Sequence, residues 1–321
     1  MSIERLVGPR FQAPFPVYPE LPELLLRAHA GRDERDATVA HVLATGAGYC
    51  YSDLATVAVI MSRLGMDECQ CVRVAQAVDA MYIFSTACLV QSRCGRVVIL
   101  SYRGTEPTNL TSWMGDFDVE CETLRSTSLD PCELQVHGGF HRNFRATRWE
   151  VERQLDLAAD GRSLADPDRR LEHKLEALYV TGHSLGGAMA VLFALTSARP
   201  ELRATYTYGQ PMVVHAPVTA NVEAVGRRIF RHVLTRDPVP ALPPASFGAF
   251  AHLGEEHQFD AGKWARAAAP TKALKNVSRA VMSTVASGLT SSKARWSLEQ
   301  HGPHRYLDAL RPKDRVTEFG D

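Results

Sequence analysis

A short glycine-rich stretch of the chain carries a serine that could act as a nucleophile. Residues 182–186 read G-H-S-L-G and fit the pattern G-x-S-x-G, and Gly187 extends it. The apolar run before it is typical of the end of a buried strand, and residues 188–194 are apolar and rich in helix formers. Strand, tight turn and helix form the context of a nucleophile elbow. The pattern therefore predicts Ser184 as a nucleophile for acyl chemistry.

A serine nucleophile needs a base, and the base needs a carboxylate that orients it. Where this chemistry is built on an α/β sheet, the acid follows the serine in the chain and the histidine comes last. Residues 229–234 are typical of a strand, and Asp237 and Pro238 follow them directly. The proline disfavours helical geometry at the residue before it. Asp237 is the predicted acid, with Asp260 in reserve.

Four histidines follow Asp237 and qualify as the base: His252, His257, His301 and His304. Pro303 fits the first position of a helix that carries Tyr306, Leu307 and Leu310 on one face. His301 would then lie on the loop before the helix. His304 would lie in its first turn, where the helix dipole disfavours the imidazolium that catalysis forms. We predict His301 as the base and keep His304 as the reserve.

Two segments are candidates to stabilise an oxyanion. The backbone N–H of Leu185, the residue after the nucleophile, is one expected donor. Residues 97–102 form a β-branched run that predicts a buried strand, and Arg103-Gly104-Thr105 ends it. Thr105 offers both its N–H and its hydroxyl, so we expect it to supply the second donor.

An apolar stripe follows this strand. Its residues, spaced i, i+3, i+4 and i+7 as on one face of a short helix, are Leu110, Trp113, Met114 and Phe117. The stripe fits a lid over an apolar acyl pocket that turns toward lipid when open. It fits a surface helix packed on the core equally well.

The elements around these residues predict an α/β fold. Strand-like runs occur at residues 81–84, 87–90, 97–102, 178–181, 204–208 and 229–234, a hairpin is indicated for 121–124 with 134–137, and residues 142–159 suggest a helix. Alternation of strands and helices favours a mostly parallel sheet with helices on both faces. We expect residues 1–75 to form a proline-rich arm and cap helices packed on a main domain of residues 76–321, which carries an insert at 261–295.

Composition limits the function classes. Lys plus Arg and Asp plus Glu both number 36 in 321 residues, so strong electrostatic attraction to nucleic acid is not implied. No run of 18 apolar residues indicates a membrane span, and no secretory signal is visible at the N-terminus. A cytoplasmic location is the default expectation, with leaderless export and peripheral membrane association left open.

The seven cysteines do not suggest a disulfide framework in a chain of this length. Cys69 and Cys71 form a lone C-x-C without a second pair, which disfavours a zinc site. We expect no metal and no cofactor. Cys121 and Cys132 could face each other across the predicted hairpin if the compartment is oxidising.

Taken together, the motifs resemble those of the class 3 lipases, a family of fungal-type triacylglycerol lipases with the α/β-hydrolase fold. The stretch 101–105 (S-Y-R-G-T) resembles the family's oxyanion segment, and 111–116 (T-S-W-M-G-D) resembles the lid that follows it. Further matches, in chain order, are V-H-G-G-F at 136–140, G-H-S-L-G-G at 182–187, Y-G-Q-P at 208–211, D-P-V-P at 237–240, and His301 followed by Tyr306 and Leu307. The last match supports His301 over His304 independently.

The resemblance covers about residues 80–310 and implies hydrolysis of carboxylic esters of lipids without a cofactor. Three features depart from it. Residues 1–75 have no counterpart, Gln300 stands where an acidic residue is common, and the insert at 261–295 is unusually long.

The insert carries an apolar helical stripe beside basic residues: Leu274, Val277, Val281, Val285 and Leu289, with Lys272, Lys275 and Arg279. A basic amphipathic helix can lie on a membrane surface. Core packing or a second lid element is the alternative.

The sequence thus predicts a serine ester hydrolase of the lipase type acting on lipid esters. A phospholipase A1 and a short-chain carboxylesterase are alternatives on the same site, because the choice depends on pocket shape. A non-catalytic binding protein that keeps the fold is the alternative from another class.

Overall fold

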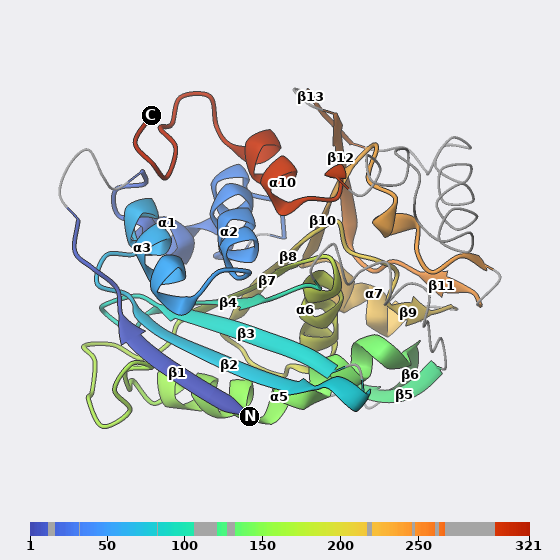
Figure 1. The fold of residues 1–321 in the computed structure, drawn as a ribbon, viewed down its shortest axis with the longest axis horizontal. Helices are drawn as coiled ribbons and strands as arrows, with labels where there is room; N and C mark the ends of the chain where they lie inside the picture. The colour runs from blue at the N-terminus through green and yellow to red at the C-terminus, as the bar shows by residue number, and fades with distance from the viewer. Residues whose placement is uncertain are drawn as a thin grey trace.

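The computed structural model describes residues 1–11, 17–31, 33–81, 83–105, 121–126, 132–216, 220–245, 248–260, 263–266 and 299–321. These residues form a central sheet between two layers of helices, with a small second sheet at one side (Figure 1). The predicted lid residues Leu110, Trp113, Met114 and Phe117 lie outside the described residues, as does most of the insert.

The central sheet has nine strands in the order β1-β2-β3-β4-β7-β8-β10-β12-β13. Its first four strands are antiparallel to one another, β4 to β12 run parallel, and β13 turns back antiparallel. The strands are β1 Ser2–Val7, β2 Gln70–Val78, β3 Ile83–Gln91, β4 Val97–Tyr102, β7 Ala177–His183, β8 Leu202–Tyr208, β10 Ile229–Leu234, β12 Glu255–Asp260 and β13 Lys263–Arg266.

The strands at the centre of this sheet are buried on both faces. Because successive side chains of a strand point to opposite faces, Val97 and Ile99 of β4 join the core on one side, while Val98 and Leu100 join the core on the other. This explains why residues 97–100 of β4 form a continuous apolar run rather than an alternating one.

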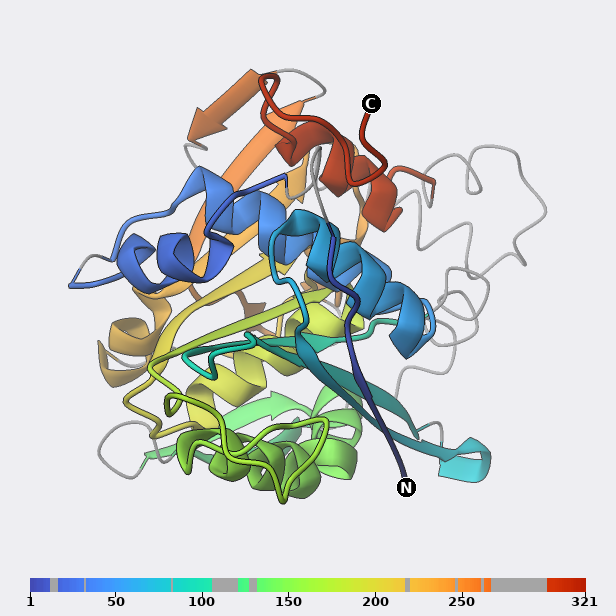
Figure 2. The ribbon, with the colours of Figure 1, turned by 90° about the vertical axis from the view of Figure 1, so that its left-hand side faces the viewer.

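One helical layer comes mainly from the N-terminus. It consists of α1 Leu21–Ala28, α2 Ala37–Tyr49, α3 Leu54–Leu64 and the C-terminal α10 Pro303–Leu310. Asp36 and Asp53 cap α2 and α3 by accepting backbone N–H groups of Val39 and Thr56. Figure 2 shows these blue and red helices above the sheet, opposite the green α5 below it.

The other face is covered by α5 Gly138–Ala159, α6 Leu185–Thr196 and α7 Ala220–Gly226. All residues of α6 are buried. A helix that is apolar all round must lie inside the protein, and α6 lies between β7 and α5 for that reason. Short 3₁₀ turns occur at Asp79–Met81 and Val239–Ala241.

The small sheet has the order β11-β9-β6-β5, formed by Phe250–Ala251, Val214–His215, Cys132–His137 and Cys121–Ser126. The predicted hairpin is confirmed, but the expected facing of its two cysteines is wrong. The register pairs Cys121 with His137 and Cys132 with Ser126. The cysteines therefore sit at opposite ends of the hairpin, and Cys121 is a free thiol.

The predicted α/β architecture is confirmed, as are the presence of helices within residues 1–75 and the strands over 97–102, 178–181, 204–208 and 229–234. The two strands predicted at 81–84 and 87–90 correspond to a single strand, β3, which begins at Ile83, whereas Met81 lies in a 3₁₀ turn. The sequence analysis did not predict β1, β2 or β12. The division at residue 75 falls inside β2, and β1 pairs with β2, so the N-terminal segment contributes two strands to the central sheet.

Candidate active site

Ser184 occupies a sharp turn between β7 and α6. Its φ of 59° and ψ of −130° lie in a region that non-glycine residues rarely adopt. A Cβ at Gly182 would collide with the backbone of Gly186, and one at Gly186 would collide with the end of β4. The glycines thus permit the close approach of strand and helix, and the turn holds the serine in a strained conformation of the kind that concentrates at functional sites.

His301 and Asp237 form a buried pair. Nδ1 of His301 lies 2.8 Å from Oδ2 of Asp237, and their side chains are 3% and 0% exposed. His301 comes from the loop before α10, whereas Asp237 follows β10, so residues 64 positions apart meet at one edge of the sheet. A carboxylate in this position accepts the Nδ1–H of the imidazole and leaves Nε2 as the free basic nitrogen.

Asp237 is held by further donors. The hydroxyl of Tyr306 donates to the same oxygen, Oδ2, at 2.5 Å, and the backbone N–H of Val239 donates to Oδ1 at 2.9 Å. Tyr306 in turn accepts the N–H of Leu234. Burial and the neighbouring carboxylate raise the pKa of Tyr306 well above its usual value, which keeps it a donor. The predicted helix starting at Pro303 places this tyrosine.

Ser184 adjoins the same pair. Its N–H donates to the carbonyl of Tyr208, and the next residue, Gly209, touches both partners: a Cβ there would lie 2.7 Å from Oδ2 of Asp237 and 2.8 Å from Cε1 of His301. Oγ of Ser184 and Nε2 of His301 are both buried, and neither has a hydrogen-bond partner among the described residues. Buried polar atoms are rarely left unpaired, and these two are the atoms that would exchange a proton with a substrate present.

The other candidate acids and bases lie elsewhere. His304 is exposed in the first turn of α10. His252 contacts the carbonyl of Pro240, and His257 lies within β12, stacked against His232. Asp260 is the last residue of β12. The structure thus brings together Ser184, Asp237 and His301 and none of the reserves.

The predicted oxyanion donors flank the serine. Leu185 begins α6, and the first N–H groups of a helix have no partner within it. Thr105 follows Gly104, whose missing Cβ would lie 3.1 Å from Cβ of Ser184. The exit of β4 therefore runs directly past Ser184, the position that the predicted oxyanion role of Thr105 requires.

His183, which the sequence analysis did not single out, is also part of the site. Its Nε2 lies 2.6 Å from the carbonyl oxygen of His301, and its ring lies 4.4 Å from that of His301, centroid to centroid. Burial, and then the proximity of His301, lower the pKa of His183 well below its usual value, so the ring is neutral. The pattern G-x-S-x-G leaves this position unspecified, so it did not indicate the contact between His183 and His301.

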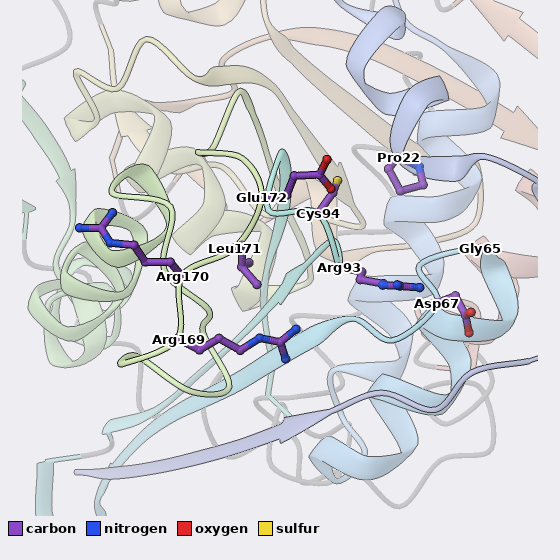
Figure 3. A pocket seen from close by; sticks show the side chains of 9 residues that line it. All are labelled: Pro22, Gly65, Asp67, Arg93, Cys94, Arg169, Arg170, Leu171 and Glu172. Atoms are coloured by element: carbon purple, nitrogen blue, oxygen red, sulfur yellow. The ribbon is translucent and has the colours of Figure 1, made fainter.

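A separate cavity of about 450 Å³ opens on another part of the surface (Figure 3). It is lined by charged side chains of both signs and a few others: Pro22, Gly65, Asp67, Arg93, Cys94, Arg169, Arg170, Leu171 and Glu172. None of these belongs to the candidate site. Within the described ranges, no helix has the length and apolar character needed to cross a bilayer.

Part of this chain, including several of the candidate site residues, matches a known family model. The family model described as lipase (class 3) matches residues 99–247. The segment includes Thr105, Ser184, Leu185 and Asp237, whereas His301 lies beyond it.

Among curated proteins, a lipase of Rhizomucor miehei is 32% identical over 169 residues, which cover 50% of this chain and 41% of the relative. Triacylglycerol lipase OBL1 of Arabidopsis thaliana is 32% identical over 176 residues, covering 46% of this chain and 34% of the relative. The matches thus span less than half the length of these relatives.

Among solved structures, a fungal lipase crystal structure superposes with a TM-score of 0.51 at 18% identity, covering 86% of this chain and 96% of that one. At this identity the likeness speaks for the fold alone, which is the α/β-hydrolase fold. The segment that carries the elbow, the acid loop and the β4 strand, residues 99–247, matches the model of the class 3 lipase family.

Proposed function

We propose that the protein is a serine ester hydrolase of the lipase type, which cleaves carboxylic esters of lipids through an acyl-enzyme intermediate. The observation that carries the proposal is the buried His301–Asp237 pair beside a serine in a strained elbow. Nucleophile, acid and base follow one another along the chain in the order expected of α/β-hydrolases.

In the first half-reaction, Nε2 of His301 takes the proton of the Ser184 hydroxyl as Oγ attacks the ester carbonyl carbon. Asp237 stabilises the imidazolium that forms. The N–H of Leu185 and the donors of Thr105 bind the oxygen of the tetrahedral intermediate. His301 then gives its proton to the leaving alkoxide, the C–O bond breaks, and the alcohol departs.

In the second half-reaction, water replaces the alcohol. His301 takes a proton from the water as its oxygen attacks the acyl carbon. Collapse of the second intermediate breaks the bond to Ser184, the proton returns to Oγ, and the carboxylic acid leaves. The cycle consumes one water for each ester and requires no cofactor.

The substrate class rests on the relatives. The printed names of two of them are lipase and triacylglycerol lipase, and we extend lipid ester hydrolysis to this chain on the shared site. Phospholipase A1 and short-chain carboxylesterase activity remain the alternatives, since the same three side chains serve any of these esters. A non-catalytic binding role is disfavoured because each residue type that the chemistry needs is present at the site.

A panel of p-nitrophenyl and glycerol esters of increasing chain length, with phospholipid beside them, tests the proposal. Each substrate is measured as monomer and as emulsion, on the wild-type protein and on Ser184→Ala. We expect turnover of long-chain esters that Ser184→Ala abolishes. Exclusive turnover of short, monomeric esters would favour a carboxylesterase. Equal rates for wild-type and Ser184→Ala would refute hydrolysis at this site.

A further inference from the structure

Tyr51 reaches the candidate site from the N-terminal segment. It lies between α2 and α3, in the part of the chain for which the family resemblance offers no counterpart. Its hydroxyl oxygen is 2.9 Å from Nδ1 of His183, and the two rings meet edge to face. A hydrogen bond to Tyr51 therefore connects His183, the residue before Ser184, to the N-terminal helical layer.

The direction of the hydrogen bonds follows from what each group can do. The carbonyl of His301 can only accept, so Nε2 of His183 carries the proton in their 2.6 Å contact. A neutral imidazole has one donor and one acceptor, so Nδ1 accepts and the hydroxyl of Tyr51 donates. The result is a chain: Tyr51 O–H to His183, then His183 N–H to the main chain of His301.

The same hydroxyl also borders the oxyanion segment. A Cβ on Gly104 would overlap Oη of Tyr51, and the guanidinium carbon of Arg103 lies 5.7 Å from the centroid of the Tyr51 ring. Tyr51 thus packs against the exit of β4 on one side and against the support of the base on the other. Tyr51 therefore contacts both the predicted oxyanion segment and His183, which supports the proposed base.

We propose that Tyr51 is a positioning residue for the reaction. Its hydroxyl fixes the tautomer of His183, His183 holds the main chain of His301, and this fixes the orientation of the His301 ring. This rests on the proposed function, in which His301 is the base. With Tyr51→Phe, Nδ1 of His183 loses this donor and the ring is free to adopt the other tautomer. That tautomer presents a lone pair, instead of a proton, to the His301 carbonyl.

The test compares kcat and KM of wild-type, Tyr51→Phe and the matched control Tyr49→Phe on one ester. Tyr49 is the last residue of α2, two positions before Tyr51, but its hydroxyl donates to Glu318 instead. We expect Tyr51→Phe to lower kcat about tenfold with KM nearly unchanged, because a hydrogen bond that orients the base acts on the transition state. Tyr49→Phe should stay close to wild-type.

A second background separates positioning from a merely structural role. In His183→Gln, the side-chain amide donates without any tautomer choice, so adding Tyr51→Phe should cost less than twofold. This non-additivity is the signature of two groups in one chain of hydrogen bonds. Thermal melts accompany each variant. If His183→Gln does not fold, the ¹⁵N shifts of the His183 ring in wild-type and Tyr51→Phe decide whether the tautomer changes.

The outcomes are distinct. If the wild-type protein hydrolyses the ester and Tyr51→Phe has the same kcat, the positioning role is overturned and the proposed function stands. The same conclusion follows if Tyr51→Phe lowers kcat as much in the His183→Gln background as in the wild-type background. An unchanged His183 tautomer in Tyr51→Phe overturns it as well. A wild-type no more active than Ser184→Ala removes the proposed function, and the role of Tyr51 falls with it.

Discussion

Oδ2 of Asp237 receives two donors at once, Nδ1 of His301 at 2.8 Å and the hydroxyl of Tyr306 at 2.5 Å. The carboxylate is therefore fixed from both sides, by the loop that carries the base and by the helix that follows it. Because α10 begins only two residues after His301, one short segment supplies both the proposed base and the tyrosine that donates to the proposed acid.

The choice between the two late histidines is directly testable. Replacing His301 by Ala removes the imidazole that pairs with Asp237, so turnover should fall by three orders of magnitude or more, roughly the loss seen when a triad member is removed. Replacing His304, exposed on α10, should retain most of the activity. Steady-state kinetics on one ester suffices, and the reverse ranking would show that His304 is the base.

Asp237→Asn should preserve the fold and remove the charge. An amide can no longer hold His301 in the required tautomer, so we expect kcat to fall by about 10³- to 10⁴-fold. Tyr306→Phe should cost far less, about tenfold, because the His301 and Val239 donors remain. If Asn at position 237 cost no more than Phe at position 306, the carboxylate would not be the partner of the base.

Sequence patterns predicted the residues of the candidate site but not the contacts around them. The proline at 303 and the dipole of the helix behind it separated His301 from His304, because both effects are local. Tyr51 and His183 escaped because their contact joins residues 132 positions apart, and neither lies in a periodic pattern. Only the packing of α2 and α3 over the sheet brings them together.

The missed strands have a similar cause. β2 reads Q-C-V-R-V-A-Q-A-V, with charge and amide inside the run, and β12 reads E-E-H-Q-F-D. Such sequences become strands because neighbours pair with them on both sides, which local propensity does not register. The prediction for the hairpin at residues 121–137 was wrong for another reason. Its two strands were predicted correctly, but the sequence does not show the register, which decides the residues that face each other.

Gly209 should be sensitive to a single methyl group. Its φ is +57°, and a Cβ would lie 2.7 Å from Oδ2 of Asp237 and 2.9 Å from Nδ1 of His301. We expect Gly209→Ala to displace the acid–base pair and lower kcat by about 100-fold or more, since small misplacements of reacting groups are costly.

Gly31→Ala is the control for Gly209→Ala. Gly31 also has a positive φ, +76°, but a Cβ there meets nothing within 4 Å. This variant carries the backbone cost alone, about 1 kcal/mol, with activity intact. Equal activity losses in the two variants, compared at matched folded fraction by circular dichroism, would contradict a steric effect on the pair.

Stability should fall as the solution becomes acidic. Burial, followed by the charge of Arg311, lowers the pKa of His41 to about 4. Between the unfolded-state value near 6.5 and 4, the unfolded chain binds a proton at this position that the folded protein excludes, so the free energy of unfolding decreases with falling pH. The pKa values of His183, His232 and His252 are lowered in the same direction by burial.

Urea unfolding at pH 7, 6 and 5 measures this dependence. His41→Gln cannot take up the proton, so its free energy of unfolding should fall less steeply on acidification than that of the wild-type protein. The two slopes should differ by up to about 1.4 kcal/mol per pH unit. Parallel curves for the two proteins would mean that His41 is protonated equally in both states.

The central claim is that the Ser184 hydroxyl is activated as a nucleophile by His301 and Asp237. A fluorophosphonate probe, which captures such a serine covalently, tests it most directly when the adduct is located by peptide mass spectrometry. We predict one adduct on Ser184 in the wild-type protein, none in Ser184→Ala, and strongly slowed labelling in His301→Ala. A folded wild-type protein that stays unlabelled, or an adduct on another residue that persists in Ser184→Ala, would contradict the account.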